Sequence, residues 1–275
     1  MQLPPILHED DALIAFDKPP GLPITVERGR SVGGISNENL LRLVREKFGY
    51  GVASVHRLDS AVSGVLLCAK TKRALDFLSG QFQGKTTQKK YHALVAVQPP
   101  ERLAAVLAPE RTATGALPET FTVELSLEED EHQQGRMHVF SHRGGRPATT
   151  EFRVLENFGP FAWVECCALT SRTHQERAHL AAAGAPVLND ALYGEPDLEL
   201  RLSALKRGYK GRDDEQPLIR RLALHASSLT VKHPTTETLL TITAPLPHEF
   251  EVALKYLRKF SVGTRKGAAA GHARR

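Results

Sequence analysis

The feature that most constrains the fold is a run of strand-like segments in the second half of the chain. They cover residues 121–127, 136–140, 149–156 and 161–169, and each is rich in β-branched, aromatic or other apolar residues. Strands that follow one another without an intervening helix favour antiparallel pairing. This part of the chain therefore predicts an antiparallel sheet.

Helical segments are expected around these strands. Apolar residues recur at helical spacing in 39–48, 72–82, 174–184 and 248–260, and Gly49 is suited to end the first of these helices. Because strands outnumber helices and often follow one another directly, the chain is expected to be an α+β protein with a mainly antiparallel sheet. Further strands are predicted at 65–69, 91–97, 222–231 and 238–244.

Basic residues gather at several places, although their overall excess is small. The 275 residues include 36 Lys and Arg against 31 Asp and Glu, which gives a formal net charge of +5. Each basic cluster alone is typical of a solvated surface, whereas several together favour a phosphate backbone as partner. The clusters are KTKR (70–73), KTTQKK (85–90), RLSALKRGYKGR (201–212), IRR (219–221) and the segment 258–275, whose charged residues are all basic.

Cysteine use and hydropathy predict a cytoplasmic protein. The three cysteines form no CxxC motif, and Cys166 and Cys167 are adjacent, which is typical of reduced thiols. The N-terminal sequence MQLPPILHEDDAL lacks the basic start and apolar stretch of a signal peptide. No stretch approaches 18 apolar residues, so we expect no membrane-spanning helix and no membrane partner.

Metal and nucleotide cofactors find no support in the sequence. His174 and His179 are five positions apart, whereas the HExxH metal motif needs a spacing of four. HQE at 174–176 has the H-x-E pattern of zinc deaminases but lacks the P-C-x-x-C that completes it. GxGxxG, GxxxxGK[ST] and GxSxG are also missing. We therefore expect no metal and no cofactor, and a zinc-dependent deaminase or hydrolase would have to contain bound metal.

The stretch HRLDSAVSG (56–64) contains one carboxylate, Asp59, between an arginine and a run of small residues. An aspartate in such a place can bond backbone amides in a turn, or it can carry chemistry. For an isolated HRLD the turn is the better interpretation, and the stretch alone leaves both open.

Together with four other segments, this stretch resembles the RluA-type pseudouridine synthases. The family signature has HRLD and then a small Ser-Gly pair, which here is Ser63 and Gly64. The five motifs follow the family's order at compatible spacing and cover most of residues 10–250. The other four are DKPPGLP (17–23), KKYHALV (89–95), SRTHQERAHLAAAGAPVLNDALYG (171–194) and RLALHASSLTVKHP (221–234).

The resemblance implies one catalytic domain over residues 1–260. Its fold would have a mixed, mainly antiparallel central sheet, flanking helices and a central catalytic cleft lined by the motifs. Many relatives carry a small RNA-binding domain before the catalytic one, and none is expected here because the first motif begins near residue 10. Residues 261–275 form a basic tail that we expect to be disordered, and we expect the protein to be a monomer.

The activity implied by the resemblance is isomerisation of specific uridines to pseudouridine in structured ribosomal or transfer RNA, without a cofactor. Asp59 matches the family's catalytic aspartate, Tyr91 the tyrosine beside the target base, and Arg177 the arginine that pairs with the aspartate. His56 and Arg57 fall at positions expected to bind RNA or substrate. A carboxylate can add to the base or the sugar, or can remove a sugar proton, and the sequence leaves these routes open.

Three positions depart from the family pattern, with Ser171 in place of Gly, Glu176 in place of an aliphatic residue and Ala178 where Val is frequent. Glu176 could compete with Asp59 for the Arg177 guanidinium, which would make the chain a catalytically impaired RNA-binding protein on the same fold. In the milder interpretation, Thr173 and Glu176 form a T-x-x-E capping box at the start of a helix, with Glu176 turned away from Arg177. We expect the capping box.

Overall fold

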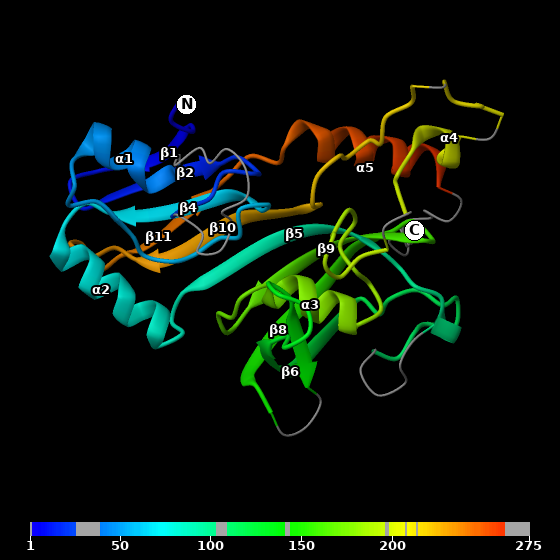
Figure 1. Cartoon of the computed structure of the whole chain (residues 1–275), viewed down its shortest axis with the longest axis horizontal. Coiled ribbons are helices and arrows are strands. Elements are labelled where there is room, and N and C mark those ends of the chain that lie inside the picture. Colours follow the sequence, from blue (N-terminus) through cyan, green and yellow to red (C-terminus); the bar gives the residue numbers. More distant parts are fainter. Residues whose placement is uncertain are drawn as a thin grey trace, which may run out of the picture.

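A single mixed sheet organises the computed structural model, which describes residues 2–25, 39–102, 109–140, 144–195, 198–206, 208–212 and 214–261 (Figure 1). The strands are β1 (Ile6–Glu9), β2 (Leu13–Lys18), β3 (Ala53–Ser54), β4 (Ser63–Ala69), β5 (Gln88–Ala96), β6 (Thr120–Glu129), β7 (Met137–Phe140), β8 (Arg146–Asn157), β9 (Phe161–Ala168), β10 (Leu224–Lys232) and β11 (Leu239–Thr243). The helices are α1 (Leu40–Phe48), α2 (Lys72–Gln83), α3 (Gln175–Ala182), α4 (Leu202–Leu205) and α5 (His248–Phe260), with a 3₁₀ turn at Pro100–Arg102.

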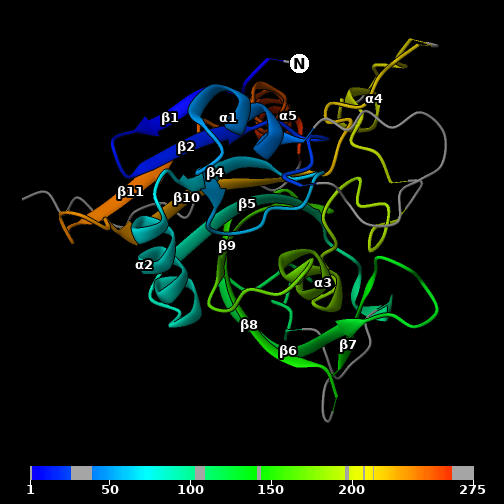
Figure 2. The same ribbon diagram turned by 60° about the vertical axis from the view of Figure 1, so that its left-hand side comes forward.

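The strands join in the order β1-β2-β4-β10-β5-β9-β8-β6-β7, with β11 paired to β10 and β3 to β4. In the described part of the chain, only the β4–β10 pair is parallel. Figure 2 shows β5, β9, β8, β6 and β7 curving around α3, which contacts β6 to β9. The predicted α+β class and mainly antiparallel sheet are therefore confirmed.

Each predicted helix and strand is present, with ends that differ by a few residues from the sequence prediction. Strands β1, β2 and β3 and the short helix α4 have no counterpart among the predictions. Strand β3 has only two residues, so its pairing with β4 rather than a local pattern makes it a strand. The expected tail lies outside the described residues apart from Ser261, and the single-domain organisation stays a prediction.

Strand β2 shows why some strands of the sheet contain several consecutive apolar residues. Ile14 and Phe16 belong to the core cluster that includes α1, whereas Leu13 and Ala15 belong to the cluster that includes α2. Alternate residues of a strand point to opposite faces, and here each face is covered by a helix. All seven residues of β4, the neighbouring strand, are buried for the same reason.

Local capping explains where α1 and α2 begin and end. The Asn39 side chain accepts a hydrogen bond from the Arg42 amide, and the Thr71 hydroxyl accepts one from the Ala74 amide. Gly49 ends α1 with a φ of 96°, a conformation that glycine adopts without a Cβ penalty. The prediction that Gly49 caps this helix is confirmed.

The capping box predicted at the start of α3 is wrong. The N-cap is His174, not Thr173, and His174 has a left-handed φ of 53° and makes no side-chain cap hydrogen bond. The helix start is fixed by contacts outside the helix instead, because the buried side-chain amide of Gln175 donates to the Thr149 carbonyl on β8 at 3.0 Å. Tertiary hydrogen bonds have overridden the local pattern, and the Glu176 carboxyl bonds its own backbone amide in place of the expected bond to Thr173.

A close approach between β4 and β10 accounts for two of the sequence motifs. Gly64 pairs with Ala226 and has a φ of 111°, and a Cβ at position 64 would lie 2.1 Å from the Ala226 carbonyl oxygen. Only glycine fits such a contact. Beside it, the Ser63 hydroxyl and His225 Nδ1 are hydrogen-bonded at 2.8 Å, both buried. The Ser63-Gly64 pair and the Leu-His-Ala stretch at 224–226 therefore meet where β4 pairs with β10.

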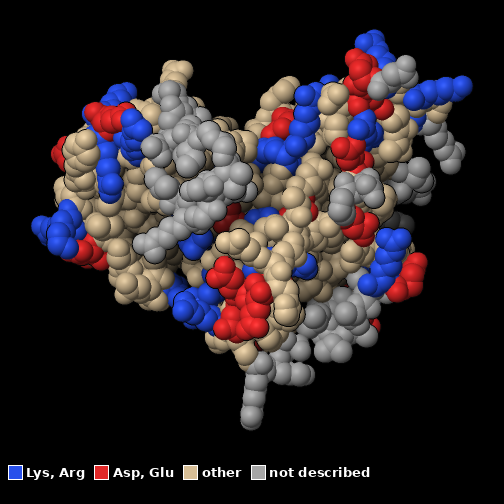
Figure 3. Space-filling view, viewed as in Figure 1, with Lys and Arg blue, Asp and Glu red and all other residues tan. Residues whose placement is uncertain are grey.

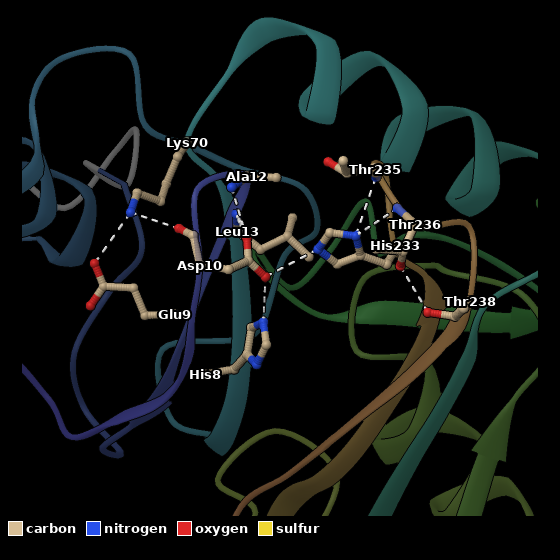
Figure 4. A network of polar contacts seen from close by, with 10 residues as sticks. All are labelled: His8, Glu9, Asp10, Ala12, Leu13, Lys70, His233, Thr235, Thr236 and Thr238. Carbon is tan, nitrogen blue, oxygen red and sulfur yellow. Dashed lines mark hydrogen bonds and ion pairs between the residues drawn. The ribbon is translucent and has the colours of Figure 1, made fainter.

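A polar network ties the β1–β2 turn to the β10–β11 turn (Figure 4). Asp10 Oδ2 accepts hydrogen bonds from His8 Nε2 at 2.6 Å and from His233 Nε2 at 3.1 Å. The other ring nitrogen of His233 accepts the amides of Thr235 and Thr236, so the proton of the neutral ring resides on Nε2. Burial opposes ionisation of Asp10, but the His8 hydrogen bond and two backbone amides lower its pKa from 3.8 to about 2.

The surface charge is dispersed on the face that Figure 3 shows. Lys and Arg lie there in several separate groups, interspersed with Asp and Glu, rather than in one continuous patch. No helix in the described part of the chain has the length and apolar character needed to cross a bilayer.

Candidate active site

The loop that carries Asp59 is attached to the early DKPPGLP turn. The buried Lys18 ammonium donates to the carbonyl oxygens of Pro19, Leu22 and Ser60 at 2.9 to 3.0 Å, and the Gly21 amide donates to Ser60 at 2.7 Å. A lysine that satisfies three carbonyls holds two loops in one geometry. Two motifs that are about 40 residues apart in sequence therefore form a single support under Asp59.

Asp59 lies at the edge of a pocket and faces two side chains from the start of α3. Its Oδ2 is 3.3 Å from Arg177 Nη1 and 3.5 Å from His174 Nε2, and its side chain is 17% exposed. Burial lowers the pKa of His174, although the Asp59 charge opposes this effect. The structure thus brings Asp59 and Arg177 together, as the sequence predicted, and adds His174.

Arg177 is held mainly by a third side chain, Asp190. Its Nε and Nη2 each donate to the Asp190 carboxylate at 2.7 Å, and the Asp190 side chain is fully buried. Burial acts against the charge of Arg177, but the hydrogen bonds and charge of Asp190, with the charge of Asp59, raise its pKa above the ordinary value. Arg177 is therefore a fixed cation that presents its remaining Nη1 to Asp59.

Two tyrosines complete the surroundings of these charges. Tyr91, on β5, is buried and lines the pocket, and burial with the charges of Glu176 and Asp59 raises its pKa well above the ordinary value. Its phenol is a neutral hydrogen-bond donor at physiological pH. Tyr193 packs its ring 5.3 Å from the Arg177 guanidinium, and its hydroxyl accepts the Met137 amide at 2.7 Å.

Glu176 lines the same pocket as Asp59, which the prediction that it turns away from Arg177 did not anticipate. Burial raises the pKa of Glu176 to about 7, and the charge of Lys89 opposes that shift. No hydrogen bond or ion pair joins Glu176 to Arg177 among the residues that the structure describes. The competition for the guanidinium that the sequence raised is absent from this arrangement, because Arg177 is divided between Asp190 and Asp59.

The two RNA-binding candidates of the HRLD motif lie in different environments. Arg57 is exposed and lines the pocket. His56 is outside the pocket lining: its Nε2 accepts the Leu67 amide at 3.0 Å, and its ring stacks on Phe82. Burial lowers the pKa of His56 to about 4, so the ring is neutral. The pocket is lined by Arg57, Leu58, Asp59, Val62, Tyr91, Ser171, Arg172, His174, Glu176 and Leu224.

Sequence reasoning missed the supporting roles of His174, Asp190 and Tyr193. Asp190 and Tyr193 stand in DALYG (190–194), the end of the motif at 171–194, to which the sequence assigned no separate role. The signal was present in the sequence, since Asp190 follows closely on the apolar segment 183–188, and a charged residue needs a partner when it is buried. Among the described residues, no three His, Cys, Asp or Glu side chains are grouped so as to hold a metal ion.

Comparison with known proteins gives a consistent result. Residues 12–182 match the family described as RNA pseudouridylate synthase. The chain is 34% identical over 253 residues to ribosomal large subunit pseudouridine synthase C of Salmonella typhi, covering 92% of this chain and 70% of the relative. It is 33% identical over 253 residues to the synthase C of Escherichia coli strain K12, with the same coverage.

Solved structures agree with the fold. Human RNA pseudouridylate synthase domain containing 1 superposes with a TM-score of 0.61 at 25% identity, covering 88% of this chain and 83% of that protein. Human RNA pseudouridylate synthase domain containing 4 has a TM-score of 0.63 at 24% identity and covers 92% of each chain, which supports the fold.

Proposed function

This chain belongs to the RNA pseudouridylate synthase family and isomerises uridine to pseudouridine in RNA, and we propose that Asp59 is the carboxylate that carries the reaction. The observation that supports this role is the contact between Asp59 Oδ2 and Arg177 Nη1 at the pocket edge. A partly exposed carboxylate with a fixed cation and an open pocket in front of it is available to a substrate.

The reaction makes particular demands on the site. The bond between N1 of uracil and C1′ of the ribose breaks, the base turns, and a bond forms between C5 and C1′. All atoms of the nucleotide are retained, so the chemistry needs bond cleavage, reorientation and proton transfer but no group from outside. The Asp59 carboxylate is suited to add to the base or the sugar, or to remove a sugar proton.

Arg177 places a fixed positive charge beside the Asp59 carboxylate. The two Asp190 hydrogen bonds use its Nε and Nη2, and the guanidinium is therefore oriented before substrate arrives. We assign to Arg177 and Asp190 the role of positioning Asp59. His174 belongs to the same cluster, because its Nε2 is 3.5 Å from Asp59 Oδ2.

Tyr91 and Arg57 are proposed to contact the RNA. The target base has to leave the helical stack to reach Asp59, at a cost of a few kcal/mol. The buried Tyr91 ring borders the pocket and offers a flat surface to such a base. The exposed Arg57 lies at the pocket edge, where a cation can contact the displaced RNA backbone.

We further propose that the substrate is large-subunit ribosomal RNA. The bacterial relatives that support this are named for the large ribosomal subunit, and the predicted basic clusters suit a polyanionic partner. A cytoplasmic location is expected from the same relationship, and transfer RNA and a monomeric state stay predictions from the sequence.

The test is pseudouridine formation in large-subunit ribosomal RNA transcribed in vitro, measured by mass spectrometry of the digested nucleosides. Asp59→Asn keeps the side-chain shape and removes the charge, and we expect it to lower the rate by about 10³-fold. Asp11→Asn, at an exposed carboxylate, is the matched control and should be fully active. Wild-type rates in Asp59→Asn would exclude this carboxylate from the chemistry.

A further inference from the structure

Glu176 is an acidic side chain that the reaction as described leaves without a role. It is the second residue of α3 and borders the same pocket as Asp59 and Tyr91. Its side chain is partly buried. Because it lines the pocket together with Asp59 and Tyr91, it can contact a base that enters there.

The Glu176 carboxyl is paired with no other side chain in the described part of the chain, and it accepts a hydrogen bond only from its own backbone amide. Among the described residues, no side-chain hydrogen bond or ion pair to it is found, and the capping bond expected from the sequence is not formed. By contrast, its neighbours Gln175 and Arg177 on α3 are hydrogen-bonded through every polar group of their side chains. A carboxyl has two oxygens, so one bond to its own amide leaves hydrogen-bonding capacity for a ligand.

The edge of uracil has the groups that such a carboxyl can bind. N3–H is a donor, and the carbonyl oxygens O2 and O4 on either side of it are acceptors. A neutral carboxyl accepts from N3–H and donates its own proton to a neighbouring carbonyl, making two hydrogen bonds, whereas a carboxylate can only accept. Enzymes that extrude a base read its Watson–Crick edge in this way.

We propose that the Glu176 carboxyl binds the N3–H and an adjacent carbonyl of the extruded uracil, and that substrate affinity follows its protonation. The inference rests on the proposed function, because it assumes that the target uracil occupies this pocket. It makes Glu176 a base-binding residue, distinct from Asp59, and it predicts turnover without Glu176 at a higher KM.

Burial of Glu176 allows its carboxyl group to be protonated near neutral pH. With a pKa of about 7, raised by burial, the carboxyl changes charge between about pH 6 and 8. Entry of the base removes more water and further favours the neutral form. The titratable and charged groups that face it are Asp59 from the loop before β4, Lys89 and Tyr91 from β5, Cys166 from β9, and Arg172, His174 and Arg177 from the start of α3.

The experiment compares two substitutions on the full chain with ribosomal RNA transcribed in vitro, from pH 6 to 8.5. Glu176→Gln has an amide that accepts and donates like the neutral carboxyl but does not titrate. Glu176→Leu has similar volume and makes no hydrogen bond. Because His174 and other groups titrate equally in wild type and variants, the informative quantity is the ratio of the KM values at each pH.

We expect the KM of wild type divided by that of Glu176→Gln to rise from about 1 at pH 6 to about 10 at pH 8.5. Glu176→Leu should have a KM about tenfold above that of Glu176→Gln at pH 6, the effect of losing a buried hydrogen bond or two. A flat ratio, or equal KM values for the two variants, would overturn the proposal while the wild type still makes pseudouridine. Absence of pseudouridine with wild type would overturn the proposed function itself. Thermal melts establish that each variant is folded, and the Glu176→Gln ratio stands alone if Glu176→Leu does not fold.

Discussion

Asp190 gives the sharpest prediction because it contacts no substrate in the proposed mechanism and yet fixes Arg177. Asp190→Asn keeps the side-chain shape, removes the negative charge and places an amide N–H against a guanidinium N–H. Of the two 2.7 Å hydrogen bonds to this fully buried carboxylate, one is then lost and the other no longer has a charged acceptor. Breaking one partner of such a buried pair costs about 3–5 kcal/mol of folding free energy.

For a chain of this size that loss lowers Tm by about 6–20 °C. The catalytic effect is separate: without Asp190, Arg177 no longer presents Nη1 to Asp59, and the loss of one oriented charge-assisted hydrogen bond slows the reaction by about 10- to 100-fold. The assay is a calorimetric melt together with single-turnover pseudouridine formation on ribosomal RNA, measured well below the Tm of the variant.

Asp76→Asn is the matched control, because it makes the same chemical change in an exposed pair with Lys72 on α2. We expect it to change stability by less than about 0.5 kcal/mol and leave the rate unaltered. If Asp190→Asn melted within 2 °C of wild type and reacted at the wild-type rate, the reasoning about the Arg177 position would be refuted.

Two further predictions concern the fold. Gly64→Ala should prevent soluble expression or abolish the cooperative melt, because its Cβ would meet the Ala226 carbonyl at 2.1 Å and its φ is 111°; a normally folded Gly64→Ala variant would contradict the strand contact. Asp10→Asn should destabilise the protein by about 1–2 kcal/mol at pH 7, less than the full pKa shift because the carboxylate is partly exposed. Since the pKa of Asp10 is lowered to about 2 from 3.8, this stability is present above pH 4 and is lost as pH falls toward 2. Urea titrations of wild type and variant should therefore differ at pH 6 and converge at pH 2, and a difference that persisted at pH 2 would argue against the Asp10 network.

The elements that could be predicted are those whose determinants are local. The helical spacing of 39–48, the glycine after it and the alternating or continuous apolar strands are properties of neighbouring residues, and the structure reproduces them. The start of α3 could not be predicted in this way. Thr173 and Glu176 satisfy the local rule for a capping box, but hydrogen bonds from Gln175 to β8 and its surroundings fix a different first residue.

In the candidate site, too, some residues could be predicted from the sequence, whereas their contacts could not. Asp59 and Arg177 could be named from the sequence, because the motifs that contain them follow the family's order at compatible spacing along the chain. That Arg177 is shared with Asp190, that His174 approaches Asp59, and that Glu176 points into the pocket follow from how α3 sits within the curve of β6 to β9 (Figure 2).

The sequence by itself determined most of the secondary structure, the family resemblance and the choice of Asp59 as the proposed reacting carboxylate, since each depends on residue type and on spacing along the chain. Only the tertiary structure decided at what distance these charges meet and which other groups, such as Asp190 and His174, join them. Asp59 and Arg177 are 118 positions apart, and their contact at 3.3 Å depends on long-range packing. Electrostatic interactions depend on distance in space and on burial, and neither is written in the local order of residues.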